Sequence, residues 1–280
     1  MEKSDILCLI YTIFVFFLLY LPIAHLVAFS FNDSMSVHYP WIKFTLDWYI
    51  GPITAVKAGF INDPMVMICL QNSLIQAAVT TLITIAVTIP TALALRKRFR
   101  GRNLIFYFLL LGMIYPGVTL GISNLLIFTQ WLHVPLGLLT VSSTVAVYTI
   151  PFGLFLLMVR FDPMLARYEE AALTLGASAW KVFRTVTFPI IKLEVIVVAL
   201  FAYTLAFGEI MRSFFVASVN FPVLPAFLYV EFGAHPPIPK FYALGSTITL
   251  ISIVSILIIG LYMSRGGGLL RRSTVVSERA

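Results

Sequence analysis

Six long apolar segments limit what this chain can fold into more than any other feature. A helix needs about 20 predominantly apolar residues to cross the hydrocarbon core of a bilayer. The segments that meet this length are 6–31, 66–95, 104–130, 138–159, 193–218 and 243–264. Only an element that satisfies its own backbone hydrogen bonds can cross lipid. The sequence therefore predicts an all-α polytopic membrane protein with six transmembrane helices.

Composition supports the same fold class. Of the 280 residues, 60% are hydrophobic and 11% are charged, whereas soluble domains carry about 25% charged residues. The first segment, 6–31, is longer than the roughly 7–15 residues of a signal peptide's apolar region, so we predict a retained first helix. Each of the first four spans contains a proline, which need not end the span because the freed carbonyls find other partners in a bundle; these are Pro22, Pro90, Pro116 and Pro151.

The distribution of basic residues predicts the orientation. Cytoplasmic loops of membrane proteins carry an excess of Lys and Arg. With the N-terminus inside, 15 of the 19 basic residues fall in cytoplasmic segments, whereas Lys43, Lys57 and Lys240 lie outside and Arg212 lies in the fifth span. The membrane topology therefore explains the excess of basic over acidic residues, and this excess does not indicate a nucleic-acid partner. Both termini are predicted to be cytoplasmic.

Two outer segments carry distinctive residue types. Segment 32–65 contains Tyr39, Trp41, Trp48 and Tyr49, which favour an aromatic belt at the lipid headgroups. Segment 219–242 is rich in proline, which suits an ordered, non-helical cap. Either segment could also contact an external partner.

The segment 161–192, between the fourth and fifth spans, is predicted to form two short helices. Asp162 and Pro163 are typical of an N-cap followed by the first helical residue. Gly176 is placed where a helix ends in a left-handed residue. Ser178 can cap the second helix, and Pro189 is expected to restart the chain into the fifth span. The pattern predicts a helix–turn–helix along the cytoplasmic face.

One face of the first of these helices could receive another protein. Ala171 and Ala172 leave a surface of small side chains, and Glu169 and Glu170 place negative charge beside it. Apolar residues at spacings of three or four predict a stripe on this helix: Leu165, Tyr168, Ala172 and Leu175. The alternative is an amphipathic surface helix without a partner.

The same loop carries a family resemblance. It contains Glu170-Ala171-Ala172, three residues, Gly176, nine residues and then Val186-Thr187-Phe188-Pro189. This arrangement resembles the EAA loop of binding-protein-dependent ABC importer permeases, whose pattern is EAA-x3-G-x9-I-x-L-P, with Val here for Ile and Phe for Leu. Six spans with this loop between the fourth and fifth also match that family. The resemblance implies a single transmembrane domain, 1–280, with its core at about 66–264.

The resemblance also implies how the loop works. In this family a coupling helix inserts into a groove on a cytoplasmic ATPase subunit, and Pro189 would set the exit angle of the chain. The residues assigned to ATPase coupling are Glu169, Glu170, Ala171, Ala172, Gly176 and Pro189. No Walker-type GxxxxGK[ST] sequence occurs in the chain. ATP and Mg would therefore be bound by the partner ATPase, and this chain is expected to be neither an enzyme nor a cofactor-binding protein.

Further partners follow from the same resemblance. The complex would contain two ATPase subunits, a second permease and an extracytoplasmic substrate-binding protein, in a bacterial or archaeal inner membrane. The pore could be a homodimer or a pair of related permeases.

Other segments resemble one branch of the family, the second permease of spermidine/putrescine importers. They are Ser30-Phe31-Asn32, the run Phe44-Thr45-Leu46-Asp47-Trp48-Tyr49, Asn72-Ser73, and the proline-rich stretch from Pro222 to Pro239. The resemblance implies a polyamine or a related small organic amine as substrate, and it favours a heterodimeric pore. Opines, aminoalkylphosphonates, ferric iron or an oxyanion, carried by the same class of importer, remain the alternative.

Ionisable residues inside membrane spans are costly and are functional candidates by default. Glu209 and Arg212 lie three residues apart in the fifth span, close enough to pair. They are interpreted either as a mutually neutralising structural pair or as part of the substrate pathway. The other candidates for the pathway are Asn72, Tyr115 and Tyr203.

Other classes of membrane protein fit the sequence less well. No catalytic or metal-binding cluster is evident in it. A secondary transporter or channel would work without an ATPase, but the inverted repeats or multiple intramembrane charges expected of a secondary transporter are not evident.

Overall fold

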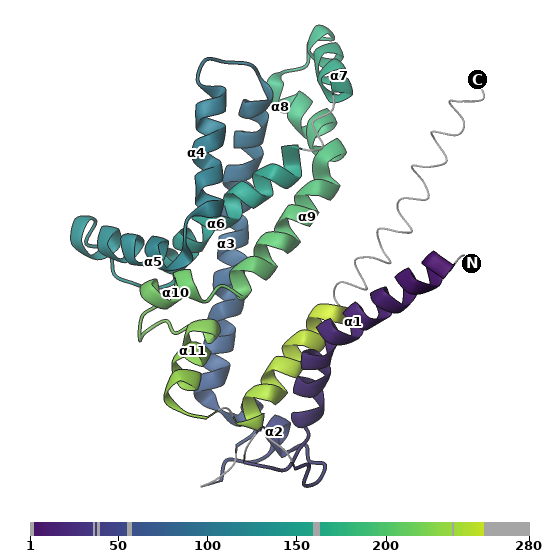
Figure 1. Cartoon of the computed structure of the whole chain (residues 1–280). Helices are drawn as coiled ribbons and strands as arrows, with labels where there is room; N and C mark the ends of the chain where they lie inside the picture. The colour runs from purple at the N-terminus through teal and green to yellow at the C-terminus, as the bar shows by residue number, and fades with distance from the viewer. Residues whose placement is uncertain are drawn as a thin grey trace. The chain divides into compact units, whose positions relative to one another are not determined.

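The computed structural model describes residues 3–35, 37, 40–54, 58–158, 163–236 and 238–254. Within these residues the chain is helical, with two isolated β-bridges and no strands (Figure 1). This confirms the predicted all-α class for the described part of the chain. The chain divides into two compact units. One is formed by the two ends, up to Met67 and from His235 onward, and the other spans Ile68–Ala234.

The unit formed by the chain ends contains α1, α2, the short helix η1 and a C-terminal helix. Their bounds are Lys3–Phe29, Asp47–Ile50, Phe60–Asn62 and Pro239–Val254. The Tyr49 hydroxyl hydrogen-bonds to the Ser30 hydroxyl at 2.7 Å and to the Ser246 hydroxyl at 2.8 Å. Tyr49 therefore joins three segments of this unit through hydroxyl contacts.

The aromatic residues of segment 32–65 differ in how far they are buried. Trp48 is buried and donates its indole N–H to the carbonyl of Asn32 at 2.8 Å. Trp41 is exposed, as a headgroup belt requires, and Tyr39 lies outside the described residues. The belt prediction is wrong for Trp48 and Tyr49, because both turn inward to satisfy polar groups of their own unit.

Asp63 lies where this unit leads into α3, which spans Pro64–Arg96. Its Oδ1 accepts from the backbone N–H groups of Met65 and Val66, at 3.0 and 3.2 Å, so it caps the helix. Its Oδ2 accepts from Lys240 Nζ at 2.7 Å. Burial alone raises the pKa of Asp63, but Lys240 and the two N–H donors outweigh it and hold that pKa below its ordinary value.

The unit spanning Ile68–Ala234 contains most of α3 and a bundle of further helices. Their bounds are α4 Arg102–Ile114, α5 Gly117–Leu126, η2 Ile127–Trp131, α6 Leu138–Met158, α7 Pro163–Thr174, α8 Ala179–Val182, η3 Phe183–Thr187, α9 Phe188–Phe207, α10 Met211–Val216 and α11 Leu224–Ala234. Buried hydroxyl groups join α3 to α6. For example, the Thr84 and Thr149 hydroxyls lie 2.6 Å apart. Such hydrogen bonds are typical between helices in lipid, where apolar packing gives little driving force.

Four helices in the described residues are long and apolar enough to cross a membrane, and one bent helix pair could be a fifth span. The four are Leu7–Phe29, Pro64–Arg96, Leu138–Met158 and Ala179–Phe207. The predicted sixth span, 243–264, begins within the helix Pro239–Val254, and residues 255–264 lie outside the described residues. A total of six spans stays a prediction.

The third predicted span, 104–130, is wrong as a single helix. α4 and α5 meet at an angle of 104° (Figure 1). The break lies at Tyr115, whose ψ of 130° is extended. Proline disfavours the helical conformation of the residue before it, so Pro116 permits this bend.

The other three prolines stay inside their helices, as predicted. Pro151 removes a hydrogen bond to the carbonyl of Val147, one turn earlier. Gly112 of α4 lies against this carbonyl, so closely that a Cβ at that position would be 2.8 Å from the oxygen. The absence of a side chain at Gly112 thus lets α4 cover a carbonyl that has lost its helical partner.

The fifth predicted span, 193–218, is also wrong as a single helix. α9 ends at Phe207, and α10 begins at Met211. Between them, Glu209 Oε1 accepts from the backbone N–H of Arg212 at 3.1 Å, one of the first-turn donors that a new helix leaves free. The side chain of Glu209 thus stabilises a helix start in place of helix continuation.

The predicted non-helical cap at 219–242 contains a helix, α11. Pro225 lies in the first turn of α11, where a missing N–H costs no helical hydrogen bond. Asn72 Nδ2 donates to the carbonyl of Pro222 at 2.9 Å, and Ser73 Oγ accepts from the N–H of Leu224 at 2.7 Å. The cap prediction fails because prolines near the start of a helix are compatible with it.

Candidate functional site

The two short helices predicted between the fourth and fifth spans are present as α7 and α8. α7 begins at Pro163, and Asp162 lies outside the described residues. Gly176 has a φ of +83°, and the N–H groups of Gly176 and Ala177 bond to the carbonyls of Leu173 and Ala172. This is the Schellman arrangement, in which a left-handed residue ends a helix.

The second helix begins as predicted but does not end at Pro189. Ser178 Oγ accepts from the N–H of Lys181 at 3.4 Å and caps α8. A π-helical turn, η3, then leads into α9, and the helical segment runs from Ala179 to Phe207. Pro189 lies in the first turn of α9 and does not restart the chain. The wider turn of η3 just before it accommodates the proline ring, which clashes with the preceding turn of a regular helix.

The two faces of α7 differ in character. Leu165 is 3% exposed and Glu169 is 9% exposed. These two residues are one helical turn apart, so they lie on the same, inward face of α7. Tyr168 is 52% exposed and Leu175 is 88% exposed. Of the four residues of the predicted apolar stripe, Leu165 is therefore buried, Ala172 is half-buried, and Tyr168 and Leu175 are exposed.

The residues assigned to ATPase coupling occupy different positions. Glu170, Ala171, Gly176 and Pro189 are exposed, whereas Ala172 is half-buried. Glu169 faces inward. On α7 the exposed residues of this set are Ala171, with a small side chain, and Glu170, with a carboxylate.

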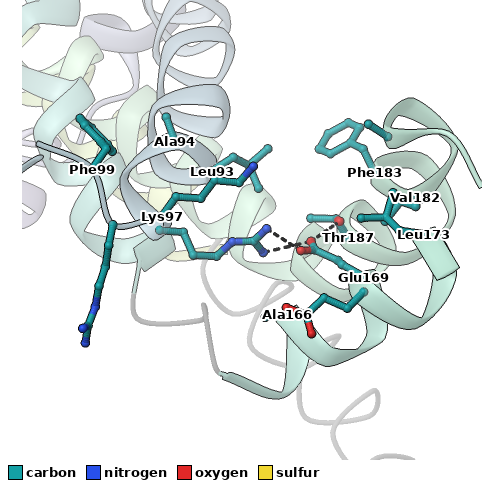
Figure 2. Close-up of a pocket in the computed structure, with 14 residues that line it drawn as sticks. Leu93, Ala94, Lys97, Phe99, Ala166, Glu169, Leu173, Val182, Phe183 and Thr187 are labelled. Carbon is teal, nitrogen blue, oxygen red and sulfur yellow. Dashed lines mark hydrogen bonds and ion pairs between the residues drawn. The ribbon is translucent and has the colours of Figure 1, made fainter.

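Glu169 is bound on both carboxylate oxygens. Arg96 Nη1 donates to Oε1 at 3.0 Å, and Arg96 Nη2 donates to Oε2 at 2.5 Å. The hydroxyl of Thr187 donates to Oε1 at 2.5 Å. Figure 2 shows these contacts as dashed lines between α3, α7 and the end of η3. The arrangement is a bidentate charged pair with a third donor.

A cavity of about 920 Å³ adjoins this cluster. Its walls come from the end of α3 with the following loop, and from α7, α8 and η3. Lining residues include Leu93, Lys97, Phe99, Leu173 and Phe183 (Figure 2). The apolar side chains of α3 and α7 therefore do not fill the space between these helices.

A second polar cluster lies at the two helix breaks. Arg212 is 7% exposed, and its Nη1 donates to Glu209 Oε2 at 2.9 Å. Its Nη2 donates to the carbonyl of Tyr115 at 3.2 Å, and its guanidinium carbon lies 3.9 Å from the centre of the Tyr148 ring. The predicted pairing of Glu209 with Arg212 is confirmed. The arginine connects the α4–α5 break to the α9–α10 break.

Two of the other pathway candidates, Asn72 and Tyr203, contact residues outside this cluster. Asn72 bonds to Pro222 as described above, and Tyr203 packs beside an apolar core that includes Ala77 and Val141. Tyr115 contributes its backbone carbonyl to the cluster. Their role in a substrate pathway stays a prediction.

Three contributors were not identified from the sequence. Arg96 and Thr187 bind Glu169, and Tyr148 lies against Arg212. Arg96 is followed directly by Lys97 and Arg98, and nothing in the sequence distinguishes it from them. Their partners lie far away in the sequence, where local patterns carry no information.

Comparisons with known proteins agree on one family. Residues 70–265 match the family described as binding-protein-dependent transport system inner membrane component. The spermidine/putrescine transport system permease protein PotC of Escherichia coli K12 is 28% identical over 242 residues, covering 85% of this chain and 87% of that protein. The PotC protein of Shigella flexneri is 26% identical over 253 residues, covering 89% of this chain and 92% of that protein.

A further relative and a solved structure extend the comparison. The putrescine transport system permease protein PotI of Escherichia coli K12 is 29% identical over 232 residues, covering 80% of this chain and 79% of that protein. A crystal structure of a bacterial ABC transporter involved in import of the acidic polysaccharide alginate aligns with a TM-score of 0.68 at 15% identity. The alignment covers 95% of this chain and 98% of that one. At this identity the match supports the fold.

Proposed function

Because this chain belongs to the binding-protein-dependent transport system inner membrane component family, we propose that it couples ATP hydrolysis in a partner subunit to the import of a polyamine. It would form half of the translocation pore together with a second, related permease. Two ATPase subunits would bind at the cytoplasmic side, and a substrate-binding protein would deliver the substrate from outside.

The coupling proposal rests on the difference in exposure between the residues of α7. The inward face of this helix is held by Leu165 and Glu169, while Glu170 and Ala171 are exposed. Small exposed side chains allow a groove of another protein to approach closely, and the carboxylate of Glu170 offers a charged contact. Movement of the ATPase subunits would displace α7 together with the helices that hold it, as in a rigid-body transition.

Reversing the charge at Glu170 tests the docking surface. We expect Glu170→Lys to lower ATP-dependent uptake at least tenfold and to reduce copurification of the ATPase, because it reverses charge at the contact. Glu170→Gln is the matched control, since it removes the charge without reversing it, and should have a smaller effect. Normal uptake by Glu170→Lys, or by a variant that lacks residues 171–176, would count against ATPase coupling through α7.

The names of the relatives support a polyamine substrate. PotC and PotI are described as permeases for spermidine and putrescine or for putrescine. Purified complex in proteoliposomes, supplied with ATP and the cognate binding protein, should accumulate labelled putrescine or spermidine. A complex that assembles and hydrolyses ATP but accumulates neither amine would exclude the polyamine proposal and leave ATP-driven import intact.

A further inference from the structure

We propose that Glu169 is a positioning residue for coupling, and that the Arg96–Glu169–Thr187 latch makes α7 move as one body with α3 and α9. This inference rests on the proposed function and gives Glu169 a role different from that of its neighbour Glu170. Glu170 would meet the ATPase, whereas Glu169 would transmit the resulting movement into the membrane-spanning helices.

The latch joins elements that are distant in the sequence. Arg96 is the last residue of α3, Glu169 lies in the middle of α7, and Thr187 is the last residue of η3, directly before α9. Both carboxylate oxygens of Glu169 are engaged, and its side chain is largely buried. A bidentate arginine–carboxylate pair fixes direction as well as distance, so α7 cannot rotate about its axis without breaking it.

The surrounding packing makes this link important for α7. Leu165 anchors the first part of α7 in an apolar cluster that includes Leu95, Leu157 and Ile191. One turn further along, the 920 Å³ cavity separates the end of α3 from α7 and α8. Across that space the contact between the two sides is polar, through Arg96 and Glu169. The latch therefore supplies the second fixed point that a rigid connection requires.

The side chain of Thr187 supports a transmitting role. Thr185, two residues earlier, bonds back to the carbonyl of Lys181 in its own helix, which is the usual local option for threonine. Thr187 instead donates to Glu169 of another helix. Because Thr187 directly precedes α9, force on α7 reaches α9 without passing through the Gly176 turn.

The experiment separates docking from transmission. Complexes with Glu169→Gln, and with Glu170→Lys as the docking comparison, are purified and reconstituted with the binding protein and a substrate for which the wild type shows ATP-dependent uptake. Three quantities are measured: copurified ATPase, substrate molecules transported per ATP hydrolysed, and the thermal unfolding midpoint. For Glu169→Gln we expect ATPase copurification within twofold of wild type and at least a fivefold fall in transport per ATP.

Two further variants keep the test decisive if Glu169→Gln folds poorly. Thr187→Val removes one donor with little change in shape and should lower transport per ATP about twofold to threefold, since two of three hydrogen bonds remain. The exchanged pair Arg96→Glu with Glu169→Arg should recover at least half of the wild-type ratio. Arg98→Gln, which removes a basic residue from the same cavity wall outside the latch, is the control and should leave the ratio unchanged.

The outcomes distinguish the possible failures. If latch variants lose the ATPase as Glu170→Lys does, Glu169 is a docking residue and the proposal is overturned. If they keep both the ATPase and the wild-type transport ratio, the latch has no transmitting role. A wild-type complex without ATP-dependent transport would instead refute the proposed function.

Discussion

Arg212 brings a permanent positive charge into an apolar bundle, and its neighbours compensate for that charge. Glu209 neutralises it, the carbonyl of Tyr115 accepts a hydrogen bond, and the ring of Tyr148 lies beneath the guanidinium. Each contact comes from a different helix or helix break. A charge buried this way is stable as a unit, but removing one member leaves another uncompensated.

Substitution of either charged residue should show this interdependence. We expect Arg212→Met to lower the free energy of unfolding by about 3–5 kcal/mol, because Glu209 is left buried without its partner. Glu209→Gln should cost less, because the amide oxygen can still accept from the N–H of Arg212. It should alter uptake while the ATPase still copurifies. Denaturant titration in detergent, with the double variant, measures the coupling between the two residues.

The double variant provides the decisive comparison. Glu209→Gln with Arg212→Met removes both charges, so its loss should be smaller than the sum of the two single losses. Additive losses would show that the two side chains contribute independently. Loss of ATPase copurification in Glu209→Gln would make Glu209 structural for the whole subunit.

At the level of elements, close approach between α4 and α6 depends on Gly112. A Cβ there would lie 2.8 Å from the carbonyl oxygen of Val147 and 3.3 Å from Pro151 Cγ. Because the oxygen belongs to the backbone, Gly112→Ala should separate the helices and cost about 1–3 kcal/mol of unfolding free energy. Gly233→Ala in α11 is the matched control, since a Cβ there meets nothing within 4 Å. Equal stability of the two variants would contradict this account.

The start of α3 should respond to pH through Asp63. Its folded-state pKa lies below the ordinary value, chiefly because Lys240 and the backbone donors outweigh the opposing effect of burial. Its charge therefore stabilises the fold above the unfolded pKa of about 3.9, and this contribution is lost as pH falls through the folded pKa. Asp63→Asn keeps an N-cap acceptor but not the charge.

Comparison of wild type with Asp63→Asn isolates the charge. We expect a difference in unfolding free energy of about 1 kcal/mol at pH 7. Unfolding midpoints measured between pH 7 and pH 3 should converge as the pH falls. A difference that stays constant across this range would show that the charge of Asp63 contributes nothing to stability.

The helix ends around α7 and α8 were predictable because their causes are local. Pro163 begins a helix, Gly176 ends it in a left-handed conformation, and Ser178 begins the next one. In each case the hydrogen bond or backbone conformation involves residues within about one turn. A sequence pattern contains all of that information.

The breaks and the latch were not predictable, because their causes are distant. Pro90 and Pro151 stay inside helices while Pro116 lies at a break. What differs is tertiary: Gly117 and Gly121 bring α5 against α10, and this packing holds the bend. Whether a proline bends a span thus depends on whether another helix packs against the segment that follows the proline. The pairing of Arg96 with Glu169 likewise joins residues that are far apart in the sequence.

At the scale of the whole molecule, the two ends of α3 differ in the charge of the residues beside them. This helix has 33 residues, so at 1.5 Å per residue it is about 50 Å long, more than the roughly 30 Å hydrocarbon core. Asp63 precedes its first residue, and Lys97, Arg98 and Arg100 follow its last. The positive-inside rule therefore predicts that the α3–α4 loop, and with it α7, lies in the cytoplasm.

Cysteine accessibility tests this orientation. In a background of Cys8→Ser and Cys69→Ala, one variant carries Lys43→Cys and another carries Arg100→Cys; both side chains are exposed. A membrane-impermeant thiol reagent should label Lys43→Cys in intact cells and Arg100→Cys only after the membrane is opened. The reverse pattern would place α7 outside, where no ATPase could reach it, and would refute both the coupling proposal and the latch. An endogenous cytoplasmic thiol protein, probed in the same cells, shows whether the membrane stayed closed.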